Sequence, residues 1–255
     1  MLHELYRGAL ADAESRQSQI GFAEIEKLAA QQLPALDVAK ILAPSSRVKI
    51  LAEVKRASPS RGDLAQIADP AQLAKVYESN GAAAISVLTE SRKFKGSLDD
   101  LTAVRNAVSV PILRKDFIAN EYQLLEARAR GADICLLIVA GLEFNVLQRL
   151  FNFTRELGMM PFVETHSKDE LMQAVDIGSS MIGVNARDLT TFQTNRDLFA
   201  ELADLFPENS IKVAESAVRE VDDVRRYREA GADVVLVGEA LVTGDPATTL
   251  RKFLE

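Results

Sequence analysis

Cysteine and histidine are scarce in this chain of 255 residues, which has one cysteine, two histidines and no tryptophan. Cys135 stands alone inside an apolar run, so a disulfide within the chain is excluded, and we expect a buried thiol in a reducing, cytoplasmic location. The usual zinc sites combine several cysteines and histidines. With only Cys135, His3 and His166 available, and no Asp-x-Asp-like cluster for magnesium, we expect no metal site.

Long apolar segments and basic clusters are also missing. No apolar stretch approaches the ~20 residues of a membrane span, and acidic residues near the start argue against a signal peptide. The formal net charge of −7 disfavours nucleic-acid binding. The G-x-G-x-x-G, P-loop and G-x-S-x-G motifs are absent as well. We therefore expect a cytoplasmic protein with no cofactor and no nucleic-acid or membrane partner.

The chain does contain a regular alternation of short apolar runs and longer amphipathic segments. The runs are rich in Val, Ile and Leu at consecutive positions, as strands buried on both faces should be. Eight strand–helix pairs predict an α/β fold, a closed (β/α)8 barrel of the TIM type, for which ~250 residues is typical. The predicted strands are 48–54, 83–88, 111–113, 134–139, 160–163, 181–184, 211–214 and 234–237.

A weak internal repeat supports this fold. Gly81, Gly131, Gly178 and Gly231 each follow a helical segment and precede an even-numbered strand, at spacings of 50, 47 and 53 residues. We predict a left-handed backbone at these positions, where a Cβ atom would be penalised. The repeat is structural and carries no functional assignment.

Residues 1–45 precede the first predicted strand. Apolar residues fall on one helical face between Leu2 and Ala13, and on another between Phe22 and Ala29. Because no linker rich in Gly, Ser or Pro follows them, we expect an N-terminal helical extension that packs on a barrel over residues 46–255. The whole chain, 1–255, is then one domain.

Charged and polar residues gather where the predicted strands end. In a parallel barrel the catalytic groups lie at the C-terminal ends of the strands, and charges elsewhere in the interior would be costly. A salt-bridged ring that only stabilises the barrel is the alternative, but catalysis is favoured. A lysine that is desolvated or surrounded by cations would have a lowered pKa and serve as an acid. The residues concerned are Glu53, Lys55, 89–90, 114–117, Glu164, 185–188, Glu215, Ser216 and Gly238.

Three loops are candidates for binding phosphate. Residues 58–62 follow the first strand with hydroxyls and a glycine, while Ser216 and Gly238 follow strands seven and eight and lead into helices. Backbone N–H groups at helix N-termini after those two strands form the usual phosphate site of such barrels. A small phosphorylated substrate is therefore predicted. His166, close to Glu164, is interpreted as an exposed loop residue that leads into the next helix.

Two of these segments resemble the indole-3-glycerol phosphate synthase family of tryptophan biosynthesis. They are E-x-K-x-x-S-P-S at 53–60 and L-x-K-D-F at 113–117, and their joint occurrence is specific. Other matching segments follow in the family's order and span nearly the whole chain, at 94–97, 162–164, 183–189, 214–216 and 237–238.

The resemblance implies a carbon–carbon lyase. It would close the ring of 1-(2-carboxyphenylamino)-1-deoxyribulose 5-phosphate and release carbon dioxide and water, giving indole-3-glycerol phosphate. Lys115 would protonate the ketone oxygen and Glu164 would be its acid–base partner, although the division of proton transfers stays open. The resemblance assigns Glu53 and Lys55 to binding and dehydration, and Asn185 and Glu215 to the substrate hydroxyls, with Arg187 nearby. It assigns the wall around the anthraniloyl ring to Phe94, Phe117, Leu136 and Leu189, and phosphate binding to Ser58, Ser216 and Gly238. It also implies association with other enzymes of tryptophan biosynthesis.

Three substitutions depart from the family pattern. Ala217 stands where many members have glycine, and alanine would weaken phosphate binding if that position requires a positive φ. Glu239 stands where a small hydroxyl residue is frequent. We expect its backbone N–H to contact the phosphate while the carboxylate turns outward. Ala186 replaces a common asparagine, with its side chain turned away from the barrel interior.

Two alternative functions stay open. Another phosphate-binding barrel enzyme, such as phosphoribosylanthranilate isomerase, would use a cysteine and an aspartate, but Cys135 lies within a predicted strand rather than at its end. A catalytically silent barrel that serves as a partner in a tryptophan-pathway complex would be expected to lack Lys115 or Glu164. Both residues are present.

Overall fold

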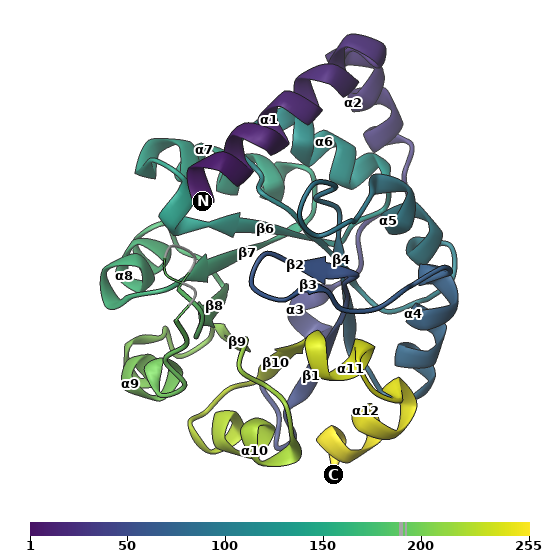
Figure 1. Ribbon diagram of the computed structural model, residues 1–255. Coiled ribbons are helices and arrows are strands. Elements are labelled where there is room, and N and C mark those ends of the chain that lie inside the picture. The colour runs from purple at the N-terminus through teal and green to yellow at the C-terminus, as the bar shows by residue number, and fades with distance from the viewer. Residues whose placement is uncertain (189–190, 192) are drawn as a thin grey trace.

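The computed structural model describes residues 1–188, 191 and 193–255. Eight parallel strands close into a barrel, which confirms the predicted fold (Figure 1). The strands are β1 (Lys49–Val54), β4 (Ala84–Leu88), β5 (Ile112–Lys115), β6 (Ile134–Ile138), β7 (Met160–Thr165), β8 (Met181–Asn185), β9 (Ile211–Glu215) and β10 (Val234–Val237). Around the barrel they follow the order β1-β10-β9-β8-β7-β6-β5-β4.

Helices cover the outside of the barrel (Figure 1). Asp69, Ser97, Asn120 and Ser167 each begin one of them by accepting a hydrogen bond from the backbone N–H three residues on, which satisfies a donor that the helix leaves unpaired. The helices are α4 (Pro70–Ser79), α5 (Leu98–Arg105), α6 (Glu121–Ala129), α7 (Phe144–Glu156), α8 (Lys168–Asp176), α9 (Leu198–Leu202), α10 (Val221–Glu229), α11 (Glu239–Val242) and α12 (Pro246–Leu254), with 3-10 turns η1 (Val139–Gly141) and η2 (Ala203–Leu205).

The side chains of each barrel strand alternate between two cores. In β1, Ile50 and Ala52 belong to the core between strands and helices, while Leu51 belongs to the core inside the barrel. The same parity in β5, β7 and β9 turns Leu113, Phe162 and Val213 inward. Because side chains of a strand repeat every two residues, the next inward position on each of these four strands lies one layer nearer the carboxyl end of the barrel.

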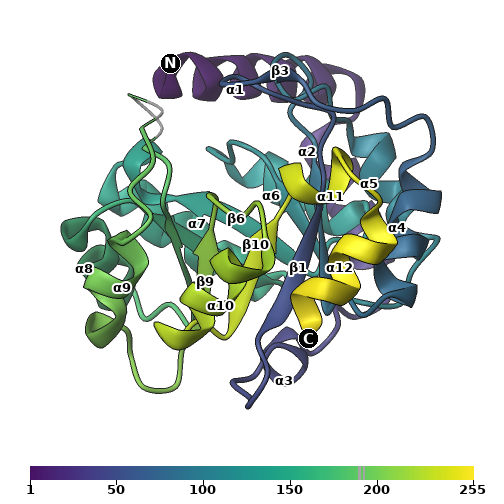
Figure 2. The same cartoon turned by 60° about the horizontal axis from the view of Figure 1, so that its bottom comes forward.

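The N-terminal extension comprises α1 (Leu2–Gln19), α2 (Phe22–Ala30) and α3 (Val38–Ile41). Helix α1 lies over the end of the barrel that also carries the short hairpin β2–β3, formed by Ala57–Ser58 and Gly62–Asp63 (Figure 2). The Tyr6 ring packs edge-on against Phe117 at 5.6 Å and leaves no room for a side chain at Gly141, where a Cβ would lie 2.0 Å from the ring.

Helix α2 packs through Ile25 and Ala29 against Tyr122 and Leu125, the last two in α6. Two other apolar residues of this helix, Phe22 and Leu28, are exposed. In the described part of the chain, no helix is both long and apolar enough to cross a membrane.

The four repeat glycines, Gly81, Gly131, Gly178 and Gly231, have φ of 97°, 84°, 77° and 91° in that order. The predicted left-handed turns before the even-numbered strands are therefore confirmed.

Candidate active site

A cleft of about 260 Å³ opens at the carboxyl ends of the barrel strands. Every described residue to which the family resemblance gives a role lines it, and Leu189 lies outside the described residues. Thr89, Glu90 and Arg114, which were also expected at this end of the barrel from their positions after strands, do not line it. The predicted residues that line the cleft are Glu53, Lys55, Ser58, Phe94, Lys115, Phe117, Leu136, Glu164, Asn185, Arg187, Glu215, Ser216, Gly238 and Glu239.

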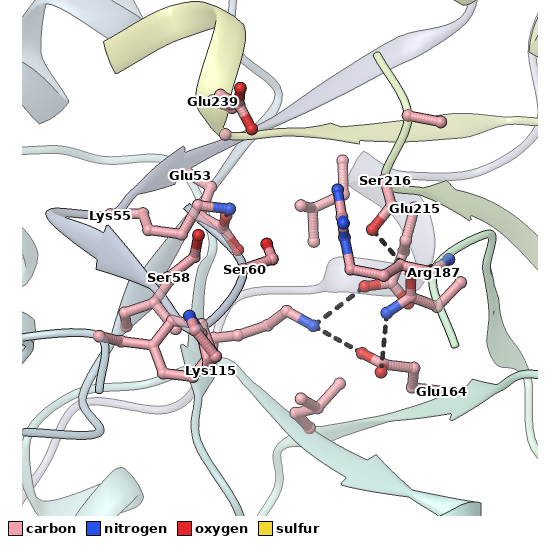
Figure 3. Close-up of a pocket in the computed structure, with 18 of the residues that line it drawn as sticks. Glu53, Lys55, Ser58, Ser60, Lys115, Glu164, Arg187, Glu215, Ser216 and Glu239 are labelled. Carbon is pink, nitrogen blue, oxygen red and sulfur yellow. Dashed lines mark hydrogen bonds and ion pairs between the residues drawn. The ribbon is translucent and has the colours of Figure 1, made fainter. Parts of the chain in front are cut away.

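Lys115 lies at the centre of the polar part of the cleft. Its Nζ donates to Glu164 Oε2 at 2.6 Å and to Glu215 Oε2 at 3.0 Å (Figure 3). These residues end or nearly end β5, β7 and β9, and Glu53 occupies the matching inward position of β1. Alternate strands of a (β/α)8 barrel contribute side chains to one layer, so these four groups form a charged layer directly above the apolar layer of Leu51 and its equivalents.

Lys115 and the two carboxylates perturb one another. Burial opposes the charge of Lys115, but the Glu164 and Glu215 carboxylates outweigh it and raise the lysine pKa above its ordinary value. The sequence-based expectation of a lowered lysine pKa is therefore wrong, because its neighbours are anions rather than cations. Burial would raise the pKa of Glu164, yet Lys115 and then His166 outweigh it and hold that pKa below its ordinary value.

Glu215 behaves in the opposite way to Glu164. Burial, followed by the negative charge of Glu164, raises the pKa of Glu215 to about 8. Its Oε1 atom is buried and has no hydrogen-bond partner among the described residues. Two neighbouring carboxyl groups whose pKa values are pushed apart can serve as one proton donor and one proton acceptor near neutral pH.

Asn185 ties Glu164 to the loop after β9. Its amide Nδ2 donates to Glu164 Oε1 at 3.1 Å. Its carbonyl Oδ1 accepts from Ser216 Oγ at 2.7 Å and from the backbone N–H of Arg187 at 3.0 Å. Because both ends of the amide are bonded, the orientation of Asn185 is fixed, and it fixes one oxygen of Glu164 in turn.

A second acid–base pair lies beside this group. Lys55 Nζ is 2.5 Å from Glu53 Oε2, and both side chains come from the end of β1. Gly238 lies directly against this pair. A Cβ atom at that position would lie 2.3 Å from Glu53 Oε2 and 2.8 Å from Lys55 Nζ. Glycine at the end of β10 therefore allows the strand to approach the pair closely.

His166 is a loop residue between β7 and α8, as predicted, but it is buried and not exposed. Its side chain is only 7% exposed, with Nε2 at 3.2 Å from Glu164 Oε1 and Nδ1 at 3.2 Å from Glu170 Oε2. Burial opposes protonation of the ring, but the two carboxylates outweigh it and raise its pKa to about 10. The Ser167-x-x-Glu170 spacing, typical of a helix N-terminus, was the available signal that a glutamate would turn back towards this residue.

The loops proposed to hold phosphate adopt unusual backbone conformations. Ser216 and Ala217 have φ of 69° and 61°, so both lie in the left-handed region. Ala217 therefore occupies a conformation in which a Cβ atom is penalised, which meets the condition stated for the glycine found in many relatives. Glu239, at the start of α11, is paired with Arg61 of the β2–β3 hairpin at 2.8 Å.

Part of the cleft lining is apolar and is called the apolar wall below. Phe94 and Phe117 lie with ring centroids 6.1 Å apart, and Leu136 belongs to the same apolar cluster. Residues that the sequence reasoning did not select also line the cleft. They are Leu5 of α1, Leu88, Ile138, Leu236, Thr194, Arg196, Val218 and Arg219.

Cys135 is fully buried within β6, and burial raises the pKa of its thiol to about 12. It is not among the described residues that line the cleft. A cysteine-dependent reaction, as in the isomerase alternative, thus finds no support from this residue.

Comparison with known proteins decides the family. The sequence profile of indole-3-glycerol phosphate synthase matches residues 2–253. The chain belongs to the indole-3-glycerol phosphate synthase family. A family member from Leifsonia xyli subsp. xyli is 58% identical over 253 residues, which cover 99% of this chain and 97% of the relative. Another, from Mycolicibacterium gilvum, is 54% identical and covers 100% and 93% of the two chains.

Solved structures support the fold alone. The 3-hexulose-6-phosphate synthase of Salmonella typhimurium aligns with a TM-score of 0.66 at 15% identity, over 81% of this chain and 96% of its own. A thiamine phosphate pyrophosphorylase from Pyrococcus furiosus aligns with a TM-score of 0.62 at 13% identity, over 85% and 96%.

Proposed function

We propose that this cleft catalyses the indole-3-glycerol phosphate synthase reaction with Lys115 and Glu164 as its central acid–base pair. The substrate is 1-(2-carboxyphenylamino)-1-deoxyribulose 5-phosphate, and the products are indole-3-glycerol phosphate, carbon dioxide and water. Membership of the family supports the reaction. The contact of 2.6 Å between Lys115 Nζ and Glu164 Oε2, at the polar centre of the cleft, is the observation that carries the residue assignment.

Lys115 is the proposed acid for ring closure. When the aromatic carbon attacks the sugar ketone, negative charge develops on the ketone oxygen and needs a nearby cation and a proton. The raised pKa of Lys115 keeps its amine protonated at neutral pH. Bound substrate would displace either Glu164 or Glu215 from the Lys115 ammonium. The lysine pKa would then fall, because one of the two charges that raise it has moved away, and the proton would pass more easily to the ketone oxygen.

Glu164 is the proposed proton acceptor and later donor. Its lowered pKa keeps the carboxylate ionised in the free enzyme. Loss of carbon dioxide restores the aromatic ring without releasing a proton, so the proton that Glu164 accepts is one released from carbon or nitrogen in the dehydration that follows. The pair of Glu53 and Lys55 is proposed to assist the final dehydration. That step needs a group to protonate the departing hydroxyl and a group to take a proton from the neighbouring carbon or nitrogen.

The rest of the cleft is proposed to bind the substrate by its two unlike ends. The apolar wall takes the anthraniloyl ring, through Phe94, Phe117 and Leu136, and through Leu189 by the family resemblance. Asn185 and Glu215 take the sugar hydroxyls, with Arg187 nearby. Phosphate is assigned to Ser58, Ser216, Gly238 and the backbone N–H of Glu239.

Three wider assignments belong to the same proposal. Residues 1–45 and 46–255 act as one domain, because α1 brings Leu5 to the cleft. The lone buried thiol of Cys135 supports a cytoplasmic location. Association with other enzymes of tryptophan biosynthesis is proposed on the family resemblance, and co-purification from a cell extract at low salt tests it.

A continuous fluorescence assay for indole-3-glycerol phosphate, with EDTA present throughout, tests the function. The wild-type protein should form product, and Lys115→Met should lower kcat by at least roughly 10²-fold, the scale of general acid catalysis. Lys75→Met, at an exposed position of α4, is the matched control and should retain turnover. Folded wild-type protein that forms no product would favour the catalytically silent partner. Near-normal turnover of Lys115→Met would show that Lys115 is not the acid for ring closure.

A further inference from the structure

His166 connects Glu164 to a third carboxylate outside the cleft. It follows β7 and precedes Ser167, the N-cap of α8, and its imidazole lies between Glu164 and Glu170 with both ring nitrogens 3.2 Å from a carboxylate oxygen. A neutral imidazole has one N–H donor, whereas an imidazolium has two. Nδ1 is hydrogen-bonded to Glu170, whereas Nε2 makes an ion-pair contact with Glu164 and has no hydrogen-bond partner among the described residues. The negative charge of a carboxylate beside each ring nitrogen favours an imidazolium.

Glu170 holds the ring from the side of the helix. Its Oε2 accepts from the backbone N–H of His166 at 2.8 Å as well as facing Nδ1, while its own N–H donates to Ser167 Oγ at 3.3 Å. The same glutamate thus helps to begin α8 and fixes the backbone and ring of His166. Its side chain is 20% exposed, so the chain of three groups runs from near the surface to the buried Glu164.

The two oxygens of Glu164 consequently have different surroundings. Oε1 faces the Asn185 amide at 3.1 Å and His166 Nε2 at 3.2 Å, whereas Oε2 faces the Lys115 ammonium at 2.6 Å. The charged and titratable groups around His166 are Glu164 of β7 and Glu170 of α8, with Lys115 of β5 and Glu215 of β9 beyond Glu164. His166 lies between Glu164 and Glu170, so a positive charge on the ring is opposed by a carboxylate on either side.

We propose that His166 is a positioning residue for Glu164: as an imidazolium held by Glu170 it binds Oε1 and leaves Oε2 to exchange protons with Lys115 and the substrate. This inference rests on the acid–base role given to Glu164 above. A structural alternative is that His166 and Glu170 serve only to begin α8. If His166 positions Glu164, its substitution lowers kcat by more than a loss of stability alone can explain. If it only helps to begin α8, kcat falls no further in a His166 variant than in another variant that destabilises α8 equally.

The protonation state of His166 can be measured directly, since the chain contains only two histidines. In a protein with 13C-labelled histidine, the ring resonance that disappears in His166→Asn identifies His166, and exposed His3 provides the other signal. We expect the His166 signal of the wild-type protein to stay at its protonated position beyond pH 8. In Glu170→Gln the signal should titrate at lower pH, and kcat should fall over the same pH range.

Turnover separates positioning from helix capping. His166→Ala and His166→Asn should each lower kcat roughly ten- to a hundredfold, less than the largest losses seen for a general acid or base, with KM within about twofold. Ser167→Ala is the matched control, because it removes the α8 cap, at a cost of ~1 kcal/mol, but keeps His166 and Glu170. It should leave kcat unchanged.

Three results would overturn the proposal. The first is a wild-type His166 signal that titrates near the ordinary histidine value of ~6.5. The second is His166 variants that keep kcat within twofold of wild type. The third is a Ser167→Ala variant whose kcat falls as far as that of the His166 variants. Failure of the proposed function is distinguishable, because a wild-type protein that forms no product still yields the His166 titration.

Discussion

Arg61 Nη2 lies 2.8 Å from Oε1 of Glu239 and so joins the β2–β3 hairpin to the start of α11. Glu239 follows Gly238, which lies directly against Glu53 and Lys55. A carboxylate at this place would repel a substrate phosphate, and the Arg61 guanidinium compensates its charge. The hairpin therefore contributes to the electrostatics of the proposed phosphate site.

Arg61→Ala should raise KM by roughly fivefold or more, equivalent to ~1 kcal/mol, because two anions then meet in partly exposed surroundings. The steady-state rate at several substrate concentrations measures this. Adding Glu239→Gln to Arg61→Ala removes the repelling charge and should return KM to near the wild-type value. If the single and double variants have equal KM, the compensation does not operate.

Ala217→Gly should stabilise the protein. Ala217 has a φ of 61°, a conformation that costs a residue with a Cβ atom about 1–2 kcal/mol, and part of this gain is offset by the greater freedom of glycine in the unfolded chain. We expect Tm to rise by about 2–4 °C per kcal/mol gained, as measured by calorimetry. Ala230→Gly, at a φ of −78°, is the control and should not raise Tm.

Gly141→Ala should loosen the contact of α1 with the barrel. The new Cβ would lie 2.0 Å from Cε2 of the Tyr6 ring, so the ring must move, at a cost of roughly 1–3 kcal/mol. Since Leu5 of the same helix lines the cleft, KM should rise and limited proteolysis should cut the extension sooner. Gly21→Ala, in open space within the same extension, should change neither measurement.

The stability contributed by His166 should depend on pH. Its pKa is raised to about 10 in the folded protein from an ordinary value of 6.5, so protonation favours folding. This contribution is fully present below pH 6.5 and is lost as the pH rises through about 10. The unfolding free energies of wild type and His166→Asn, from denaturant titrations, should therefore differ most at pH 6 and converge near pH 10. A difference that stays constant over this range would contradict the assignment.

Much of the site could be predicted because a closed parallel barrel converts linear order into position. Runs of Val, Ile and Leu identified the strands, and the residues that follow each run must meet at one end. The period of two along a strand placed Glu53 and Lys55 on the same side without knowledge of any contact. That is why each described residue to which the family resemblance gives a role lines the cleft.

Contacts between residues remote in sequence decided the rest. Lys115 meets carboxylates 49 and 100 residues away, and their charges, not the burial of the lysine alone, set the direction of its pKa shift. His166 was taken for an exposed loop residue because local sequence does not show that β7 and α8 place two carboxylates on either side of its ring. Helix α1 likewise reaches the cleft only through tertiary packing on Gly141.

The sequence by itself therefore determined the fold, the end of the barrel that carries the chemistry and the residue types gathered there, because these depend on periodicity and strand direction. The tertiary structure alone decided which carboxylate stays ionised, which lysine is held as a cation and how His166 is held. Those properties depend on the distances between charges in a buried environment, where electrostatic interactions are strong and vary steeply with separation.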